Sequence, residues 1–389
     1  MRVLLAGGGT AGHINPAIAI AKEILIKHSD AQILFVGTSM GMEKKLVPAA
    51  GFAIKYIDVQ GFRRKLTWQN VTTVTKLVRS LKESREIIEE FKPDIAIGTG
   101  GYVSGPVIYM AHKMGVKTLI HEQNAFAGLT SKLLSRVVDC VAISFEESRK
   151  YFRHGRKVVL TGNPLRGEIL GANKGRAREK LGLDDSPMLL AFGGSLGAKP
   201  LNDALTELIM STCSVAGAGD GAGVGTDEGT RAGDDSAGYQ VIFATGERFY
   251  EEICKRLSES GAKFSCDIGW GRVRVVPYIN DMASAMAAAD VVVARGGAIT
   301  LGEITALGKA SVIVPSPYVT NNHQEYNARA LEAKGACVVV IEDELARLGN
   351  EVRGLLDDEL RREEIARSAR DLGILDANER IMRLVDELT

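Results

Sequence analysis

Short apolar runs alternate with longer segments of helical periodicity along most of the chain. The runs are rich in Val, Ile and Leu, which is typical of strands buried on both faces of a parallel sheet. We predict strands near residues 3–6, 32–36, 53–58, 94–98, 117–121, 138–142, 157–161, 188–192, 240–244, 273–276, 290–294, 311–315 and 336–340. The helical segments between them indicate an α/β fold built from doubly wound parallel sheets.

The alternation pauses once, which divides the chain into two similar α/β halves. A polar stretch begins at residues 161–166 and lasts until the strand near residue 188. We therefore expect a first domain at residues 1–165 and a second at residues 166–374. Residues 375–389 have the spacing of an amphipathic helix that packs back on the first domain. Residues 214–238, rich in Gly and Asp, offer little apolar surface to offset ordering entropy and are expected to form a mobile insertion.

Composition narrows the class of protein. The 389 residues carry a formal net charge of zero, which argues against a nucleic-acid-binding protein that works through bulk electrostatics. The five cysteines are scattered without a C-x-x-C pair, so we interpret them as reduced thiols, not a disulfide framework or a zinc site. We expect no signal peptide, because the first predicted strand begins almost at once, and we expect no membrane span, because no run of about 18 apolar residues occurs.

The most informative segment is a glycine-rich turn at residues 7–12, followed directly by His13. It lies between the first predicted strand and a helical run from Pro16 to Ile26, where backbone N–H groups face a polar or anionic ligand. The turn matches G-x-G-x-x-G, but no Asp or Glu follows the second strand to hold the ribose of a dinucleotide. A turn without any ligand is the plainer alternative. His13 distinguishes this turn, because an imidazole can serve as a general base.

Two further glycine turns lie in the second half of the chain. At residues 193–198, Ser195 follows a buried strand and is expected at a helix N-terminus, where its hydroxyl could bind a phosphate or simply cap the helix. At residues 295–303, Glu303 lies about one turn into the next helix. Its carboxylate could accept two hydrogen bonds from a ribose diol, or only complement the helix dipole.

Other polar residues follow predicted strands and are candidates for the same site. His121 and Asn124 belong to an H-E-Q-N segment, although His121 could equally be a satisfied histidine at a strand end. Arg166, at the junction of the halves, could clamp a diphosphate or be an exposed linker charge. Gln324 lies in an amide-rich block at residues 320–327, which suits sugar hydroxyls or a polar helix start.

Two patterns bear on the membrane and on metals. Residues 61–85 combine apolar positions with a basic face that contains Lys76, Arg79, Lys82 and Arg85. Such a face suits an anionic membrane surface, and a core-facing helix with a solvated basic face is the alternative. No D-x-D triplet occurs in the chain, so we expect no bound metal. Helix dipoles and individual side chains would then have to hold a diphosphate.

Taken in order along nearly the whole chain, these motifs resemble the MurG family of bacterial cell-wall glycosyltransferases. The resemblance rests on GGTAGHINPA, GTGGYVSGP, HEQNAFAGLTSK, TGNPLR, GGSLGA, YINDMA, GAITLGE and PSPYVTNNHQEYNA. It implies a GT-B fold, in which two Rossmann-like domains face each other across a cleft, with the acceptor on the first and the UDP-sugar on the second. Two departures from the family pattern are Ala11, where a glycine is usual, and Gly296, where Ser or Ala is more common.

The resemblance also implies a reaction. The enzyme would transfer N-acetylglucosamine, with inversion, from UDP-N-acetylglucosamine to the C4 hydroxyl of MurNAc in lipid I, an undecaprenyl-pyrophosphoryl-MurNAc-pentapeptide. The product would be lipid II for peptidoglycan synthesis, on which cell shape and division depend. We expect a peripheral protein on the cytoplasmic side of the cell membrane, without a cofactor and without a nucleic-acid partner. A UDP-N-acetylglucosamine 2-epimerase, or a GT-B transferase with another lipid acceptor, is the alternative.

Individual residues take roles by the same resemblance. His13 is the candidate base on the acceptor side. Ser195 and Arg166 would hold the diphosphate, Glu303 the ribose, Gln324 the sugar hydroxyls, and the Ile279 backbone the uracil. The expected substrate-binding residues are Thr10, Ala11, Gly12, Asn124, Arg166, Ser195, Ile279, Ala298, Ile299, Thr300, Leu301, Gly302, Glu303 and Gln324.

Overall fold

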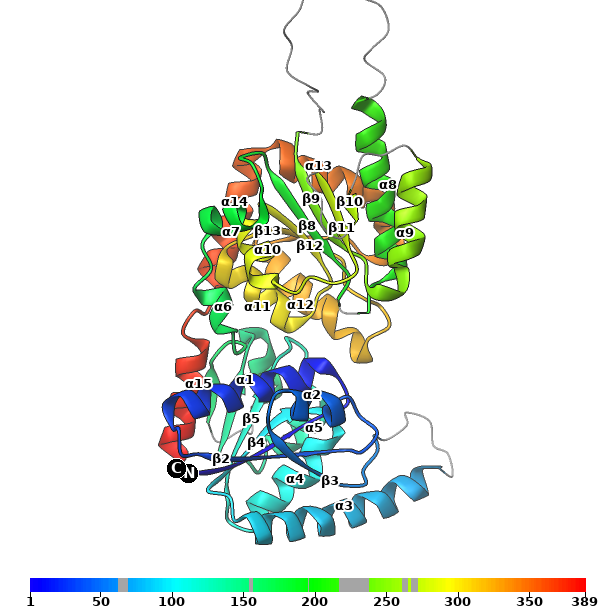
Figure 1. Ribbon diagram of the computed structural model, residues 1–389. Helices are drawn as coiled ribbons and strands as arrows, with labels where there is room; N and C mark the ends of the chain where they lie inside the picture. Colours follow the sequence, from blue (N-terminus) through cyan, green and yellow to red (C-terminus); the bar gives the residue numbers. More distant parts are fainter. Residues whose placement is uncertain (62–68, 154–156, 195, 217–237, 261–264, 267–271) are drawn as a thin grey trace, which may run out of the picture. The chain divides into compact units, whose positions relative to one another are not determined.

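The structure is a computed structural model that describes residues 1–61, 69–153, 157–194, 196–216, 238–260, 265–266 and 272–389 (Figure 1). Contacts between Cα atoms divide the chain into two compact units. Unit 1 comprises Met1–Arg166 with Ile374–Thr389, and unit 2 comprises Gly167–Gly373. The expected insertion at residues 214–238 lies almost entirely outside the described residues.

Unit 1 alternates strands and helices as the sequence predicts. Its elements are β1 (Arg2–Gly7), α1 (Ala11–Lys27), β2 (Gln32–Gly37), α2 (Glu43–Ala49), β3 (Ala53–Tyr56), α3 (Gln69–Phe91), β4 (Ile95–Gly100), α4 (Gly101–Lys113), β5 (Lys117–Glu122), α5 (Leu129–Leu134), β6 (Cys140–Ile143), η1 (Glu146–Tyr151), β7 (Val158–Leu160) and α15 (Ala377–Leu388). Among the described residues, seven strands form one parallel sheet in the order β3-β2-β1-β4-β5-β6-β7. This order is that of a doubly wound sheet.

The core of unit 1 explains why its strands appear as continuous apolar runs. Val3 and Leu5 of β1 face a cluster formed with α1, α2 and α15, whereas Leu4 and Ala6 face a cluster formed with α3, α4 and α5. All four side chains are fully buried. Because helices cover both faces of the sheet, successive residues of a central strand are apolar without alternation.

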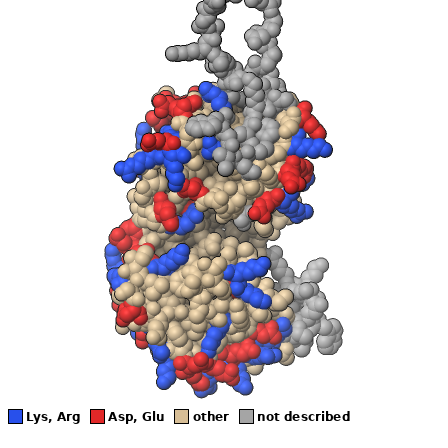
Figure 2. Space-filling view, in the orientation of Figure 1, with Lys and Arg blue, Asp and Glu red and all other residues tan. Residues whose placement is uncertain are grey.

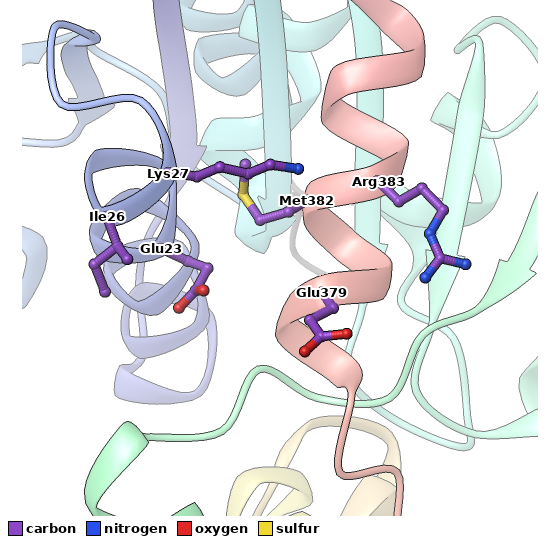
Figure 3. Close-up of a pocket in the computed structure, with 6 residues that line it drawn as sticks. All are labelled: Glu23, Ile26, Lys27, Glu379, Met382 and Arg383. Atoms are coloured by element: carbon purple, nitrogen blue, oxygen red, sulfur yellow. The ribbon is translucent and has the colours of Figure 1, made fainter.

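The C-terminal helix α15 belongs to unit 1, where it lies beside α1 (Figure 1). Ile381 and Val385 are buried in the cluster that also contains Ile20 and Ile24 of α1. At the surface, Asp386 accepts a hydrogen bond of 2.9 Å from Nε2 of His28. A shallow hollow of about 440 Å³ remains along this contact (Figure 3). It is lined by Glu23, Ile26, Lys27, Glu379, Met382 and Arg383.

Unit 2 repeats the plan of unit 1. Its elements are α6 (Gly167–Leu170), α7 (Lys174–Leu181), β8 (Met188–Phe192), α8 (Lys199–Ala216), β9 (Gln240–Ala244), α9 (Glu247–Glu259), β10 (Ser265–Cys266), β11 (Val273–Val276), α10 (Met282–Ala288), β12 (Val291–Ala294), α11 (Ala298–Leu307), β13 (Ala310–Ile313), η2 (Thr320–Asn322), α12 (His323–Glu332), β14 (Val338–Val339), η3 (Glu342–Arg347), α13 (Leu348–Asp357) and α14 (Glu359–Leu372). The described strands form a seven-stranded parallel sheet in the order β10-β11-β9-β8-β12-β13-β14. The sequence predicted each of these strands except β10.

Candidate active site

Unit 1 brings together the loops that follow β1, β4 and β5, because these three strands are neighbours in the sheet. The chain winds in opposite directions on the two sides of the β1–β4 pair, and open α/β sheets bind their ligands beyond the strand ends at such a switch point. The sequence predicted that these loops share one edge of the sheet, and the contacts of His13 described below confirm it.

His13 lies in the first turn of α1 and is half-buried. The predicted helix start at Pro16 is wrong, since α1 begins at Ala11 with Thr10 as its N-cap residue. The backbone carbonyl of His13 accepts a hydrogen bond of 2.7 Å from Oγ1 of Thr99, a residue of the neighbouring strand β4. Helix geometry and Thr99 together fix the position of the His13 backbone.

The His13 ring lies against Gly100 and Gln123. A Cβ atom built at Gly100 would come within 2.6 Å of Nδ1 of His13, so the ring occupies the space that a side chain at residue 100 would need. Nδ1 of His13 lies 3.2 Å from Oε1 of Gln123. Sequence reasoning missed Gln123, whose only signal was its place between two candidate residues.

His121 is a buried, satisfied histidine, which is the plainer of its two interpretations. Its side chain is 1% exposed. Nε2 lies 3.0 Å from the carbonyl oxygen of Gly162, and Nδ1 lies 3.0 Å from Nε2 of Gln123. Burial lowers the pKa of His121 despite the opposing effects of the Gly162 hydrogen bond and the Glu122 charge, which keeps the imidazole neutral.

Glu122 orients the neighbouring Asn124. The Glu122 carboxylate is buried and accepts hydrogen bonds from the backbone N–H and the side-chain amide of Asn124, at 3.2 and 3.3 Å. It also accepts a hydrogen bond of 3.0 Å from the backbone of Gly128. Asn124 is thereby held half-exposed at the edge of the sheet, where a sugar could reach it.

Glu43 is a second residue that sequence reasoning missed. It is fully buried at the start of α2 and accepts hydrogen bonds from the Thr38 backbone at 2.8 Å, from the Thr38 hydroxyl at 2.7 Å and from the Gly9 backbone at 3.1 Å. An acidic residue does therefore lie close to the end of β2. Its carboxylate, however, is engaged by Thr38 and by the backbone of Gly9 in the first glycine turn, so it is not available to hold the ribose of a dinucleotide.

Glu43 gives a testable prediction about stability. We expect Glu43→Gln to lower the free energy of unfolding at pH 7 by about 1–3 kcal/mol, because the amide group cannot accept from all three donors. Denaturant unfolding measures the change. Glu86→Gln, whose carboxylate is exposed on α3, is the matched control and should change stability by less than about 0.5 kcal/mol. Equal effects of the two variants would contradict the supporting role of Glu43.

The same variant has a defined pH dependence. Burial opposes ionisation of Glu43, but hydrogen bonds from Thr38 and Gly9 outweigh it and hold the pKa below its ordinary value of 4.5. The carboxylate therefore contributes stability that is fully present above pH 4.5 and is lost as the pH falls through the folded-state pKa. The difference in the free energy of unfolding between the wild type and Glu43→Gln should therefore become smaller below pH 4.5.

Unit 2 has its own hollow at the corresponding switch point, between β8 and β12. Its volume is about 470 Å³. The lining combines the second glycine turn with residues that follow β12, β13 and β14: Phe192, Gly193, Gly194, Leu196, Gly197, Ala198, Lys199, Pro200, Arg295, Gly297, Thr300, Ser316, Tyr318, Gln324 and Glu342. Of the expected binding residues that the structure describes, Thr300 and Gln324 reach this hollow.

A largely buried ion pair between Arg295 and Glu342 forms part of the wall of this hollow. The Arg295 guanidinium also donates to the carbonyl oxygens of Val314 and Pro315, at 3.1 and 3.3 Å. Gln324 is fixed nearby, because its Oε1 accepts a hydrogen bond of 2.9 Å from the Ser316 backbone. Sequence reasoning gave Arg295 no role and did not find Glu342, since the partners are 47 positions apart along the chain and no local motif links them.

The remaining expected residues are spread over both units. Thr10 precedes α1 as its N-cap residue, and Ala11 and Gly12 are the first residues of the helix. Ala11 is not among the non-glycine residues with positive φ, so its methyl group is accommodated without backbone strain. Residues 298–303 form the first turns of α11, in which Glu303 is only 3% exposed. Ile279 follows β11, and Arg166 is exposed at the end of its segment of unit 1.

Ser195 lies outside the described residues. The helix that follows the second glycine turn, α8, begins at Lys199.

The basic face predicted on α3 is largely neutralised by acidic neighbours. Arg79 pairs with Glu83 at 2.8 Å and Arg85 with Glu89 at 2.7 Å. Lys76 and Lys82 likewise contact Asp58 and Glu86, at 2.9 and 3.9 Å. Figure 2 shows acidic and basic side chains mixed along the edge of unit 1 where Figure 1 places α3. For α3, the alternative of a core-facing helix with a solvated charged face is the better description, since Ile87 and Ile88 are buried in the core of unit 1. Residues 62–68 of the predicted segment lie outside the described residues.

Metal-binding clusters and membrane-spanning helices are both absent from the described residues. No group of three or more His, Cys, Asp or Glu side chains in this part of the chain is arranged to hold a metal ion. Among the helices that the structure describes, none combines the length and the apolar character needed to cross a bilayer.

Comparison with known protein families assigns each unit to a domain family. The family model of the glycosyltransferase family 28 N-terminal domain matches residues 3–143, and that of the family 28 C-terminal domain matches residues 188–381. A relative from Acetivibrio thermocellus is 46% identical over all of this chain and 98% of its own length. It is named UDP-N-acetylglucosamine--N-acetylmuramyl-(pentapeptide) pyrophosphoryl-undecaprenol N-acetylglucosamine transferase.

Solved structures agree with these matches. The crystal structure of MurG from Acinetobacter baumannii is similar over 99% of both chains, with a TM-score of 0.76 and 29% sequence identity. A UDP-GlcNAc 2-epimerase from Neisseria meningitidis has a TM-score of 0.62 over the full length of both chains, at 14% identity. The second likeness concerns the fold alone, which is the GT-B fold that the sequence predicted.

Proposed function

The chain belongs to the MurG-type transferases of glycosyltransferase family 28, and we propose that it transfers N-acetylglucosamine from UDP-N-acetylglucosamine to the C4 hydroxyl of MurNAc in lipid I, giving lipid II. Unit 1 takes the lipid-linked acceptor and unit 2 takes the donor. The observation that carries this proposal is the imidazole of His13, held by Thr99, Gly100 and Gln123 at the switch point of unit 1.

The donor binds in unit 2, at the hollow between β8 and β12. The N-terminus of helix α11 lies at this hollow, since Gly297 and Thr300 line it, and the helix dipole and the Thr300 hydroxyl together suit the charge of UDP. Gln324, fixed by Ser316, presents its amide group to the sugar hydroxyls. Ser195 and Arg166 hold the diphosphate, Glu303 the ribose, and the Ile279 backbone the uracil.

The acceptor hydroxyl attacks the anomeric carbon from the face opposite UDP. As the new C–O bond forms, the bond to UDP breaks and its electron pair leaves with the phosphate oxygen. His13 takes the proton of the attacking hydroxyl. The α-linked donor thus gives a β-linked product in one displacement. Helix N-termini, Ser195 and Arg166 stabilise the charge that develops on UDP, and we propose no metal for this step.

Product analysis tests this proposal against its alternatives. The purified chain is incubated with radiolabelled UDP-N-acetylglucosamine, with and without a lipid I analogue in detergent. We expect labelled lipid and free UDP only when the acceptor is present. Conversion of the donor without acceptor would instead indicate an epimerase, and labelling of a different lipid would indicate a transferase with another acceptor.

We also propose that unit 1 meets the cytoplasmic face of the membrane at α5, not along α3. Leu129 and Leu133 on α5 are 68% and 55% exposed. Lys132 lies between them in sequence, and Arg136 follows as an exposed cation. Exposed leucines beside basic residues suit an interface with anionic lipids, where the undecaprenyl chain of the acceptor would be anchored.

Gly296 gives a prediction about donor binding. A Cβ at residue 296 would lie 2.5 Å from the carbonyl oxygen of Gln324, so Gly296→Ala should displace the start of α12 together with the Gln324 side chain. We expect the KM for UDP-N-acetylglucosamine to rise roughly 3- to 10-fold, as for the loss of about one hydrogen bond. Steady-state kinetics at saturating acceptor measures the change.

Gly171→Ala is the control for this substitution, because its added carbon would lie 3.7 Å from the nearest neighbour. It should leave the KM for the donor unchanged. A Gly296→Ala enzyme with wild-type KM would show that α12 does not position Gln324 for the donor.

A further inference from the structure

We infer that Gln123 is a positioning residue that holds His13 in the tautomer with its proton on Nδ1, so that Nε2 carries the lone pair that accepts the proton of the acceptor hydroxyl. This inference rests on the proposed function for its chemistry, but the tautomer itself follows from the hydrogen bonds of unit 1. It states which of His13 and Gln123 donates the hydrogen bond between them, because the distance between the two atoms alone does not show this.

The backbone carbonyl of Gly162 fixes the first proton, because a carbonyl oxygen can only accept a hydrogen bond. It lies 3.0 Å from Nε2 of His121, so this nitrogen carries a proton. Ser144 does not compete for that role: its hydroxyl donates to Oδ1 of Asn163 at 3.0 Å and offers only a second acceptor to His121, at 3.2 Å. His121 is fully surrounded by protein and neutral, so its other nitrogen, Nδ1, is bare and must accept.

The bare Nδ1 of His121 then orients the Gln123 amide. Nε2 of Gln123 lies 3.0 Å from this nitrogen and 2.9 Å from the backbone carbonyl oxygen of His121, so its two protons meet two acceptors. With the amide reversed, Oε1 would face both acceptors with no proton between them. Because Gln123 is 2% exposed, water cannot relieve that repulsion. The amide orientation is therefore determined by the protein.

The orientation of Gln123 finally assigns His13. Oε1 of Gln123 points to Nδ1 of His13 at 3.2 Å, and an amide oxygen can only accept. His13 therefore donates from Nδ1, and the neutral ring is left with its lone pair on Nε2. The ring cannot move away easily, because Gly100 and Thr99 confine its side chain and backbone. A base for the acceptor hydroxyl is thus prepared before substrate binds.

Nitrogen NMR of the wild-type chain tests this inference directly. The six histidines are labelled with ¹⁵N and ¹³C, and His13 is assigned by comparison with His13→Ala. We expect the neutral His13 ring to show a protonated Nδ1 and an unprotonated Nε2. A protonated Nε2 in the neutral ring would overturn the inference.

Kinetics of Gln123→Met supplies a second, independent readout. Methionine fills similar space but offers His13 only a weakly accepting sulfur in place of the amide oxygen. We therefore expect about a 10-fold fall in kcat, little change in the KM for UDP-N-acetylglucosamine, and loss of the Nδ1–H preference. Ser144→Ala removes a half-buried hydroxyl of the same neighbourhood but leaves the Gly162 carbonyl to fix His121. It should keep the His13 tautomer unchanged and kcat within about twofold of wild type.

The outcomes separate the two proposals. A wild-type enzyme that transfers sugar but holds His13 with a protonated Nε2 contradicts the tautomer assignment alone. A wild-type chain with the expected tautomer but no sugar transfer contradicts the proposed function alone. An equal loss of kcat in Gln123→Met and Ser144→Ala, with the tautomer unchanged in both, would show that Gln123 acts only through general packing. Should Gln123→Met fail to fold, the wild-type spectrum still decides.

Discussion

Replacing His13 with alanine is expected to lower kcat for sugar transfer by about 10²–10⁴-fold, the usual contribution of a general base. The hydroxyl of a sugar is a poor nucleophile until its proton is removed, and in unit 1 the His13 imidazole is the group positioned at the β1–β4 switch point to remove it. The donor contacts of unit 2 are untouched, so the KM for UDP-N-acetylglucosamine should change little. Steady-state rates with a lipid I analogue measure both quantities.

His112→Ala is the matched control for this substitution. His112 lies in the last turn of α4, at the end of that helix away from the glycine turn, and should tolerate alanine with kcat within about twofold of wild type. Circular dichroism and thermal unfolding establish that both variants fold. A folded His13→Ala enzyme with near-normal turnover would remove His13 from the role of base.

Gly100→Ala is expected to lower kcat by about 100-fold while the imidazole stays in the chain, because displacement of a catalytic group by about 1 Å can cost this much. The added Cβ would lie 2.6 Å from Nδ1 and 2.9 Å from Cε1 of His13, so the ring must leave the place where Gln123 holds it. Gly100→Ala keeps the imidazole but displaces it, whereas His13→Ala removes it. Comparing the two variants therefore shows how much of the rate depends on where the base lies. Rates are measured under the same conditions.

Gly100 also has a φ of +110°, so alanine at this position strains the backbone and lowers stability by about 1–2 kcal/mol. Gly115→Ala controls for that strain, since Gly115 has a φ of +78° and a Cβ added there would meet nothing within 4 Å. Gly100→Ala should lose more stability than Gly115→Ala, because Gly100 also has a ψ of −173°, a combination open essentially to glycine alone, and because its Cβ meets the His13 ring. Only Gly100→Ala should lose activity. Equal kcat values for the two variants would show that the His13 ring does not need the space above Gly100.

The strands and their order of appearance were predictable, because strands buried on both faces leave continuous apolar runs such as residues 3–6. The gathering of His13 and Asn124 at one edge was predictable for a related reason, since parallel strands present their carboxyl ends together. The first residues of the helices were harder to predict from the sequence. Thr10 is a residue type favoured at N-caps and does precede α1, but the glycines around it and the proline at residue 16 favoured a later start.

The supporting residues could not be predicted, because their partners are distant in sequence. Glu43 is 34 positions from Gly9, and Gln123 is 110 positions from His13. Neither contact follows from spacing within a motif, since each depends on which loops the sheet order brings together. The charge pattern of α3 misled for a simpler reason: the basic residues were weighed without Glu83 and Glu89, which pair with them at i+4.

The structure of the product tests the central claim most directly. The purified wild-type chain is incubated with UDP-N-acetylglucosamine and a lipid I analogue, and the lipid-linked disaccharide is isolated and characterised by mass spectrometry and proton NMR. We predict one added N-acetylglucosamine, joined through a β linkage to C4 of MurNAc, with one UDP released per sugar transferred. An α linkage, attachment at another hydroxyl, or loss of donor without a lipid-linked disaccharide would contradict inverting transfer to lipid I.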